Sequence, residues 1–236
     1  MKTLVIRLAA PLQSYGDPAS FEKRTTFRAP SKSAIIGMIG AALGFRRESD
    51  DYKSLNDLDF AVRVDQPGEV LSDFQITRYS LKKSGIKLSH RIYLQDAVFM
   101  VALSSEQDAL MEEIEYALRH PKFQLYFGRR SNPPAGILKM KMCPDKTAIN
   151  VLKELPWQAS VWFQRKYRKD VFNARIYADA KLVPDRPNRL IKDAVGSFNQ
   201  KSRYYEYRSV AEDNVFLENS NYFQRKNTDH DIWASI

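Results

Sequence analysis

Residues 8–44 read LAAPLQSYGDPASFEKRTTFRAPSKSAIIGMIGAALG, and this stretch decides the first half of the fold. Large apolar and β-branched residues predict a strand over residues 3–10. A helix is predicted over residues 32–43, where Ser31 or Ser33 can cap the first turn. The loop between strand and helix is polar and basic and holds one Tyr and two Phe. We therefore interpret it as a surface on which a polar ligand docks.

Glycines shape the predicted helix. Gly37 and Gly40 share a face and lower its intrinsic stability, so we expect a close approach of the helix backbone to the sheet. Gly44 is typical of the residue that ends a helix.

The composition favours a folded, basic protein. The chain has 236 residues with 44% hydrophobic and 12% aromatic residues, which suits a sizeable core. Its formal net charge of +9 favours a polyanionic partner such as nucleic acid. Cys143 is the single cysteine, which excludes an intramolecular disulfide and a zinc site with two Cys ligands. No run approaches the ~18 apolar residues of a membrane span, and Arg7 interrupts a signal-like N-terminus, so we expect a cytoplasmic protein without membrane contact.

The order of elements predicts an α+β fold of the ferredoxin-like (RRM-like) βαββαβ type. A hairpin is expected between residues 59–65 and 70–76, and one buried strand over residues 92–103. Ser104 and Gln107 resemble a capping box for a second helix that ends before Pro121. A last strand is expected over residues 137–142. Helices on one face of such a sheet would leave the other face, or the rims, for RNA.

Two regions of the chain are predicted. Residues 1–150 would form the ferredoxin-like domain, and residues 151–236 a β-rich C-terminal extension, with strands near 173–178 and 204–210. From Pro156 onward, aromatic and basic residues interleave. This extension could be a small appendage or extra strands on the first domain, and we favour subunit docking or core packing over RNA contact for its aromatic-basic part.

A basic segment over residues 77–91 reads TRYSLKKSGIKLSHR and contains no acidic residue. It predicts a protruding hairpin or flexible loop, and an ordinary solvated loop is the alternative. A second feature, residues 122–134, reads KFQLYFGRRSNPP, in which Arg129 and Arg130 offer forked donors to phosphate or to a guanine edge. The alternative is that these arginines pair with carboxylates inside the domain.

Catalytic chemistry has little support in the sequence. The histidines are His90, His120 and His230, and none has a metal-ligand spacing. The chain has no G-x-S-x-G elbow and no P-loop. His90 with Lys87 and Tyr93 is one conceivable acid–base set. We expect no catalytic residues, no metal and no cofactor.

Two motifs carry a resemblance to a known family. The first motif resembles the opening of the CasD (Cas-five) family, the RAMP-type subunit of type I CRISPR complexes. It comprises residues 4–8 (LVIRL), 11–16 (PLQSYG), 30–37 (PSKSAIIG) and 42–44 (ALG). Residues 126–131 (YFGRRS) resemble the family's Y-L-G-R-R-S, and a weaker match through residues 175–179 (RIYAD) is like the C-terminal part of the type I-E subgroup. The chain departs from the family pattern at Ala10, Tyr15 and Ala34, where Gly, Trp and Gly are usual.

This resemblance implies a ferredoxin-like fold with a protruding β-hairpin thumb. It implies a non-catalytic subunit that holds the 5′ handle of crRNA and caps the complex, which is called Cascade. Cascade is a hetero-oligomer for antiviral defence, and the subunit would contact its backbone subunit and its large PAM-sensing subunit. In the I-C subgroup the related protein is instead a metal-independent endoribonuclease that processes repeat RNA. A general RNA-recognition-like scaffold that joins proteins is a third hypothesis.

The expected RNA-binding residues come from four segments. In the first, side chains after the opening strand would meet bases; in the second, the helix N-terminus would meet a phosphate. The basic thumb and the double-arginine loop would complete the site. The candidates are Gln13, Ser14, Tyr15, Lys23, Arg24, Arg28, Ser31, Lys32, Ser33, Arg78, Lys82, Lys83, Lys87, His90, Arg91, Arg129, Arg130 and Ser131.

Overall fold

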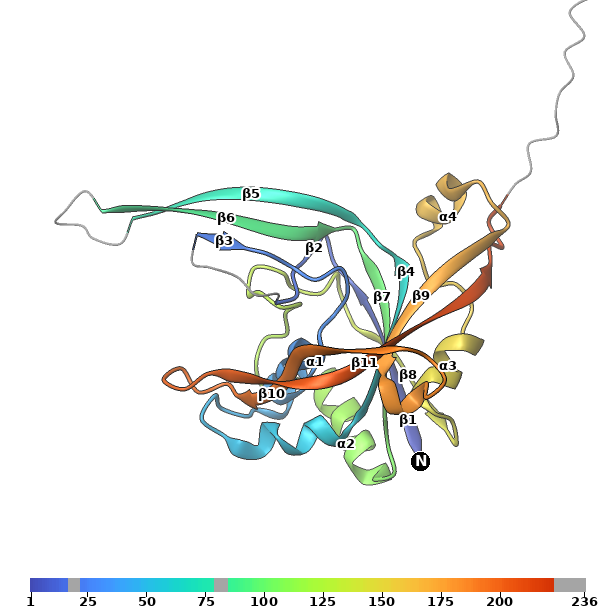
Figure 1. Cartoon of the computed structure of the whole chain (residues 1–236), viewed down its shortest axis with the longest axis horizontal. Coiled ribbons are helices and arrows are strands. Elements are labelled where there is room, and N and C mark those ends of the chain that lie inside the picture. The colour runs from blue at the N-terminus through green and yellow to red at the C-terminus, as the bar shows by residue number, and fades with distance from the viewer. Residues whose placement is uncertain (17–21, 79–84, 223–236) are drawn as a thin grey trace, which may run out of the picture.

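The computed structural model describes residues 1–16, 22–78 and 85–222. A seven-stranded sheet has the order β10-β11-β9-β4-β7-β1-β8, and in a smaller sheet β6 pairs with β2, β3 and β5. Helices and mostly antiparallel strands mix along the chain, so the predicted α+β class is confirmed (Figure 1). The elements are β1 (Lys2–Ala9), β2 (Leu12–Gln13), β3 (Lys23–Arg24), α1 (Lys32–Leu43), η1 (Asp50–Tyr52), η2 (Ser54–Asp57), β4 (Asp59–Gln66), β5 (Glu69–Arg78), β6 (Ile86–Gln95), β7 (Val98–Ser105), α2 (Asp108–Arg119), β8 (Lys139–Pro144), α3 (Ala148–Glu154), α4 (Val161–Tyr167), β9 (Val171–Asp179), η3 (Ala180–Leu182), β10 (Asn188–Ser197) and β11 (Tyr204–Glu218).

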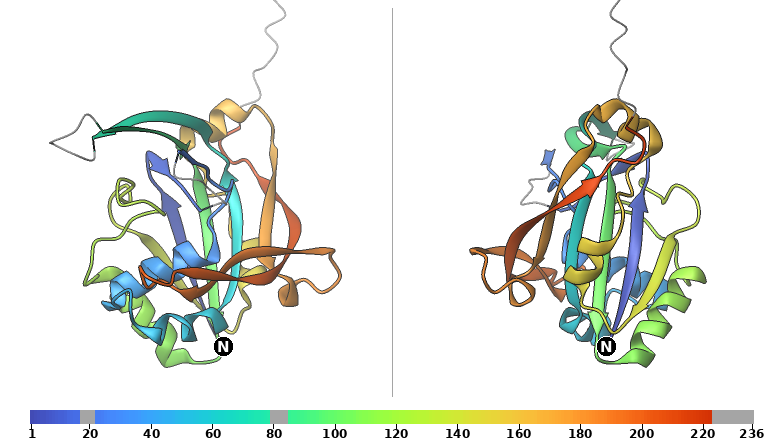
Figure 2. Two further views of the ribbon diagram at one scale, coloured as in Figure 1. Left: turned by 60° about the vertical axis from the view of Figure 1, so that its left-hand side comes forward. Right: turned by 90° about the vertical axis from the view of Figure 1, so that its right-hand side faces the viewer.

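Strand β1 lies between β7 and the edge strand β8, and it is apolar on both sides because helices cover both faces of the large sheet there. Leu4, Ile6 and Leu8 belong to the main core with residues of α1 and α2. Val5 lies on the opposite face, in a second core to which α3 contributes Leu152 (Figure 2). The expectation that one face of the sheet stays open is therefore wrong at its centre.

The middle of the chain pairs differently from the prediction. The strand β4 pairs with β7 and β9, whereas β5 pairs along its whole length with β6. The expected hairpin between residues 59–65 and 70–76 is therefore wrong. The expected single strand over residues 92–103 is also wrong, because the chain turns at Asp96, where φ is 55°, and separates β6 from β7. The β5–β6 hairpin extends away from the large sheet (Figures 1 and 2).

Helix α1 has the predicted bounds, and Gly44 ends it with φ of 88°. Its glycines serve a contact other than the one expected. A Cβ on Gly40 would overlap the ring of Tyr52 from η1, so the close approach is to that ring and not to the sheet. The capping box expected for α2 is absent, since the Ser104 hydroxyl accepts a hydrogen bond from the Ala148 N–H at 3.0 Å instead.

The C-terminal extension continues the large sheet beyond β4. Strand β9 pairs with β4, and β11 and β10 follow it outward. Helix α4 and strand β10 were not predicted. The division of the chain near residue 150 stays a prediction, although the described strands on either side of it share one sheet.

Candidate nucleic-acid interface

Arg129 lies at the centre of a group of basic and aromatic side chains. Its guanidinium carbon lies 4.7 Å from the centroid of the Tyr93 ring on β6. Its Nη2 donates to the Arg24 carbonyl oxygen on β3 at 3.1 Å. Its Nη1 is buried and has no hydrogen-bond partner in the described part of the chain. Unsatisfied buried donors are rare in folded proteins, so this N–H is suited to an acceptor supplied by a ligand.

Tyr93 is polarised by its neighbours. Burial raises the pKa of Tyr93, but interactions with Arg129 and Ser131 oppose that effect and leave the pKa below its ordinary value. The phenol oxygen therefore lies in a positive local field, which would also attract a phosphate oxygen.

The loop that holds Arg129 is fastened to the strand β2 region by its backbone. The Ser14 N–H donates to the Phe127 carbonyl at 3.2 Å, and the Phe127 N–H donates to the Asn132 carbonyl at 2.8 Å. Gly128 has φ of 83°, and a Cβ there would overlap the Ser14 carbonyl oxygen. The GRRSN sequence therefore needs its glycine, because no other residue lets the two segments approach this closely.

Two basic segments that are distant in sequence meet at β6. Lys23 and Arg24 of β3 pair in parallel with His90 and Arg91 of β6. The His90 N–H donates to the Glu22 carbonyl at 2.7 Å. The structure thus brings together the basic part of the first loop, the hairpin and the Arg129 loop.

The remaining candidates lie around this cluster or beyond it. Arg28, Arg78, Lys87, Arg130 and Ser131 are exposed. Lys82 and Lys83 lie outside the described residues.

Three predicted base contacts do not fit their positions. Gln13 is fully buried, and its Nε2 donates to the Ala97 carbonyl at 2.7 Å. The Tyr15 hydroxyl donates to the Gln13 Oε1 at 2.6 Å, and its ring packs edge-on against Phe99 in the core. The Ser14 hydroxyl donates to the Ile92 carbonyl at 3.2 Å. Gln13 thus satisfies the backbone where β6 turns into β7, Ser14 satisfies the backbone within β6, and Tyr15 holds Gln13 in place. The expectation that these side chains contact RNA bases is therefore wrong.

The helix N-terminus is likewise occupied by the protein itself. The Lys32 N–H donates to Asp193 Oδ2 at 2.9 Å, and the Lys32 ammonium pairs with Asp179 at 3.2 Å. Ser31 is buried, makes no cap hydrogen bond through its side chain and lies 3.4 Å from the Ser33 hydroxyl. A carboxylate from β10 thus takes the place that the sequence suggested for a phosphate, so this part of the predicted site is wrong.

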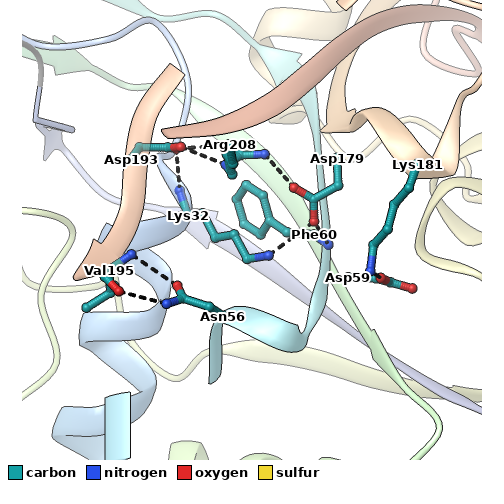
Figure 3. A network of polar contacts seen from close by, with 9 residues as sticks. All are labelled: Lys32, Asn56, Asp59, Phe60, Asp179, Lys181, Asp193, Val195 and Arg208. Atoms are coloured by element: carbon teal, nitrogen blue, oxygen red, sulfur yellow. Dashed lines mark hydrogen bonds and ion pairs between the residues drawn. The ribbon is translucent and has the colours of Figure 1, made fainter. Parts of the chain in front are cut away.

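Lys32, Asp179, Asp193 and Arg208 form a buried charge cluster that joins α1 to β9, β10 and β11 (Figure 3). Arg208 donates to Asp193 through Nε at 2.6 Å and Nη2 at 3.0 Å, and to Asp179 through Nη1 at 2.7 Å. Burial lowers the pKa of Lys32, and the charge of Asp179 offsets part of that effect. Sequence alone gave no indication of the cluster, because its members lie far apart along the chain.

The β5–β6 hairpin has two chemically different faces, since paired residues share a face. Asp73, Arg91 and Tyr93 lie on the polar face, toward Arg129. The other face carries an apolar stripe in which each side chain is between 46% and 64% exposed: Val70, Phe74, Ile76, Ile86 and Leu88. This apolar stripe was missed, although the alternation of IKLSHRIYL could have indicated it.

The conceivable acid–base set is not assembled. His90 faces Phe74, with their ring centroids 5.0 Å apart, on the apolar side of the hairpin. Lys87 and Tyr93 lie on the polar side, because odd and even residues of a strand point to opposite faces.

The residues that the structure describes hold neither a metal-binding cluster nor a membrane-spanning helix. No group of three or more His, Cys, Asp or Glu gathers where a metal could bind. No helix there has both the length and the hydropathy to cross a membrane.

The fold and the site together define a mixed α+β protein whose smaller sheet presents a cluster of arginines and an aromatic ring. Known proteins share this architecture. The family model described as CRISPR-associated protein (Cas_Cas5) matches residues 3–211. The CRISPR system Cascade subunit CasD of Escherichia coli (strain K12) is 36% identical over an alignment of 174 residues, and the match covers 62% of this chain and 75% of that protein.

Solved structures agree with this match. A chain of a CRISPR RNA-guided surveillance complex superposes with a TM-score of 0.72 at 30% identity, over 92% of this chain and 91% of that one. A chain from a structure described as a Cas protein superposes with a TM-score of 0.65 at 28% identity, over 93% of this chain and 97% of that one. The chain belongs to the CasD (Cas-five) family of CRISPR-associated proteins.

Proposed function

We propose that this chain is a non-catalytic subunit of a type I CRISPR surveillance complex, Cascade, and that it binds the 5′ handle of crRNA and caps the complex in the cytoplasm. The similarity to a Cascade subunit and to a chain of an RNA-guided surveillance complex supports the assembly. The buried, unpartnered N–H of Arg129 within the basic cluster is the observation that carries the RNA-binding role.

The topology supports the finer part of this proposal. The elements β1, α1, β4, β7, α2 and β8 follow the βαββαβ order, and their strands lie in the order β4-β7-β1-β8. We assign them to a ferredoxin-like unit and the β5–β6 hairpin to its thumb. RNA would lie against the polar face of the hairpin, beside Arg91 and Arg129.

The apolar stripe of the hairpin supports a protein partner. Exposed apolar side chains that lie contiguously on one face indicate an interface, because they gain free energy when a partner removes them from water. We assign this face to the backbone subunit of the complex. The large PAM-sensing subunit is the other expected partner of the hetero-oligomer.

The test is a binding measurement with synthetic handle RNA. The double variant Arg129→Ala/Arg130→Ala should weaken binding about tenfold or more and lower the salt dependence by about 0.7 for each lost phosphate contact. The exposed pair Arg46 and Arg47 offers a matched control, since removing it deletes the same charge from the loop that follows α1. Equal affinities for the wild type and the Arg129/Arg130 variant would refute the proposed site.

Catalysis is tested separately with repeat RNA in EDTA. The proposal predicts that purified protein leaves the RNA intact. A discrete cut that disappears in His90→Ala would show a metal-independent endoribonuclease instead.

A further inference from the structure

Helix α4 presents an exposed surface of its own outside the site described above. The surface is formed by the outward side chains of α4 and by the two residues directly after the helix. Together they comprise one indole, four cations and one small apolar residue. We call this set the α4 surface: Val161, Trp162, Arg165, Lys166, Arg168 and Lys169. None of the four cations has an ion pair with any residue that the structure describes.

The helix is held rigidly from beneath. Phe163 and Tyr167 point inward and pack with Trp157 and Phe172 in an aromatic core. Gln164 is buried and donates to the Ala159 carbonyl at 2.9 Å. Trp162, in contrast, is 53% exposed, although a large apolar ring would gain free energy from burial. The core therefore does not need this indole, and its place on a rigid support suits a ligand.

We propose that the α4 surface is a second nucleic-acid contact, which takes a single-stranded segment by stacking a base on Trp162 and holding its phosphates with the cations. Single-strand sites typically combine an aromatic platform with neighbouring basic side chains. Trp162, Arg165 and Lys166 recur at helical spacing on one side of α4, and Arg168 and Lys169 follow directly after the helix ends at Tyr167. An acidic protein is the alternative partner, since tryptophan is common at protein interfaces, and unchanged oligonucleotide affinity in Trp162→Ala would favour it.

A cavity of about 240 Å³ beside the indole can receive the base. Trp162 and Lys166 line one wall, and Glu69 and Asp96 at the base of the hairpin line the other. Carboxylates accept hydrogen bonds from the exocyclic amines of cytosine, adenine and guanine, whereas thymine and uracil have none. The cavity should therefore prefer cytosine to thymine, which stacks with similar area.

This surface is distinct from the Arg129 site. In Figure 1, α4 lies at the upper right, whereas β3, which contacts Arg129, lies to the left. The α4 surface does not depend on the proposed handle site, so each can be tested while the other is disabled.

The experiment measures binding of labelled single-stranded oligo(dC) and oligo(dT) by the full chain carrying Arg129→Ala/Arg130→Ala. Oligonucleotides of about 20 nucleotides exceed the roughly 4–16 that such a site covers. Trp162→Ala should lower the affinity for oligo(dC) by about fivefold or more, whereas Trp162→Phe should keep most of it. Arg165→Ala/Lys166→Ala should lower both the affinity and its salt dependence.

Controls separate binding from folding. Tyr116→Ala, on the exposed side of α2, removes another exposed aromatic ring and should leave affinity unchanged. Binding of oligo(dC) should quench tryptophan fluorescence in the parent protein and not in Trp162→Phe.

Unchanged affinity in Trp162→Ala, or binding of duplex as tight as that of single strands, would overturn the proposal. Equal affinity for oligo(dC) and oligo(dT) would overturn the seating of the base in the cavity. If the α4 variants weaken binding while Arg129→Ala/Arg130→Ala alone has no effect on handle RNA, this inference stands and the proposed handle site falls.

Discussion

Replacing Arg208 with methionine should strongly destabilise the protein. The Arg208 side chain is 12% exposed and satisfies Asp193 and Asp179 with three hydrogen bonds. Methionine retains an apolar stem that can lie against Phe60, whose ring centroid is 5.1 Å from the guanidinium carbon. The substitution thus removes the charge and leaves two buried carboxylates to share the single cation of Lys32.

The expected size follows from that imbalance. Removing one partner of a buried ion pair costs about 3–5 kcal/mol, because the remaining charge is buried without compensation. In a domain of about 150–250 residues, each kcal/mol shifts the thermal midpoint by about 2–4 °C, so we expect a decrease of ~6–20 °C. Urea unfolding followed by circular dichroism measures the same free energy independently.

Arg189 provides a matched control on the neighbouring strand. Its Nη2 lies 2.9 Å from the Glu212 carboxylate, but the two side chains are 61% and 40% exposed. Arg189→Met should therefore change the free energy of unfolding by less than about 1 kcal/mol. Should Arg208→Met not fold, Arg208→Lys keeps the charge and should fall between the two. A loss in Arg208→Met no larger than that in Arg189→Met would refute the reasoning.

Three further predictions concern the loop that holds Arg129, the first loop and the extension. Gly128→Ala should destabilise the protein and weaken RNA binding, because the new Cβ would overlap the Ser14 carbonyl. Gly136 has the same φ of 83° but open space around its Cβ, so it is the control. Thermal melts should show only the smaller backbone penalty of about 1 kcal/mol for Gly136→Ala. Gln13→Ala should cost about 1–3 kcal/mol in urea unfolding because buried partners lose their hydrogen bonds, while RNA affinity of the folded protein stays unchanged; a selective loss of affinity would restore the base-contact hypothesis. Burial raises the pKa of Asp213, but its basic partners outweigh that effect and hold the pKa below the ordinary value. The ionised carboxylate therefore stabilises the fold above the ordinary pKa, and this stabilisation is lost as the pH falls through the lowered pKa. Asp213→Asn should therefore be less stable than the wild type at pH 7, and the difference in urea midpoints should shrink as the pH falls through the lowered pKa.

Much of the fold could be predicted because the apolar periodicity is strong where helices cover the sheet. Strand β1 and helix α1 have nearly their predicted bounds. The error at residues 92–103 has a specific cause. Both β6 and β7 are apolar where they meet, so the run reads as one strand, and only the short polar pair Gln95 and Asp96 marks the turn between them.

The site was harder to predict because polar residues next to a strand serve two purposes that look alike in sequence. Gln13 and Lys32 have the chemistry of RNA ligands, but both are satisfied by partners distant in the chain, Ala97 and Asp179. Arg129 has the same chemistry, yet one of its donors has no partner among the described residues. Only the structure separates these cases, since it shows which donors the fold has already used.

The buried charge cluster explains why the first loop can present a basic site at all. Lys32 and Asp193 fix the start of α1 against the extension, while Ser14 fixes the start of the loop against the Phe127 carbonyl. The loop between these two anchors is thereby led past β6, where Lys23 and Arg24 join the sheet. A polar residue that contacts no ligand thus still determines where the ligand-facing residues lie, because a loop of this length would otherwise have many conformations of similar energy. Loss of the cluster should consequently weaken RNA binding only to the extent that it frees the loop, which makes the stability of the extension and the affinity for RNA linked quantities in this fold.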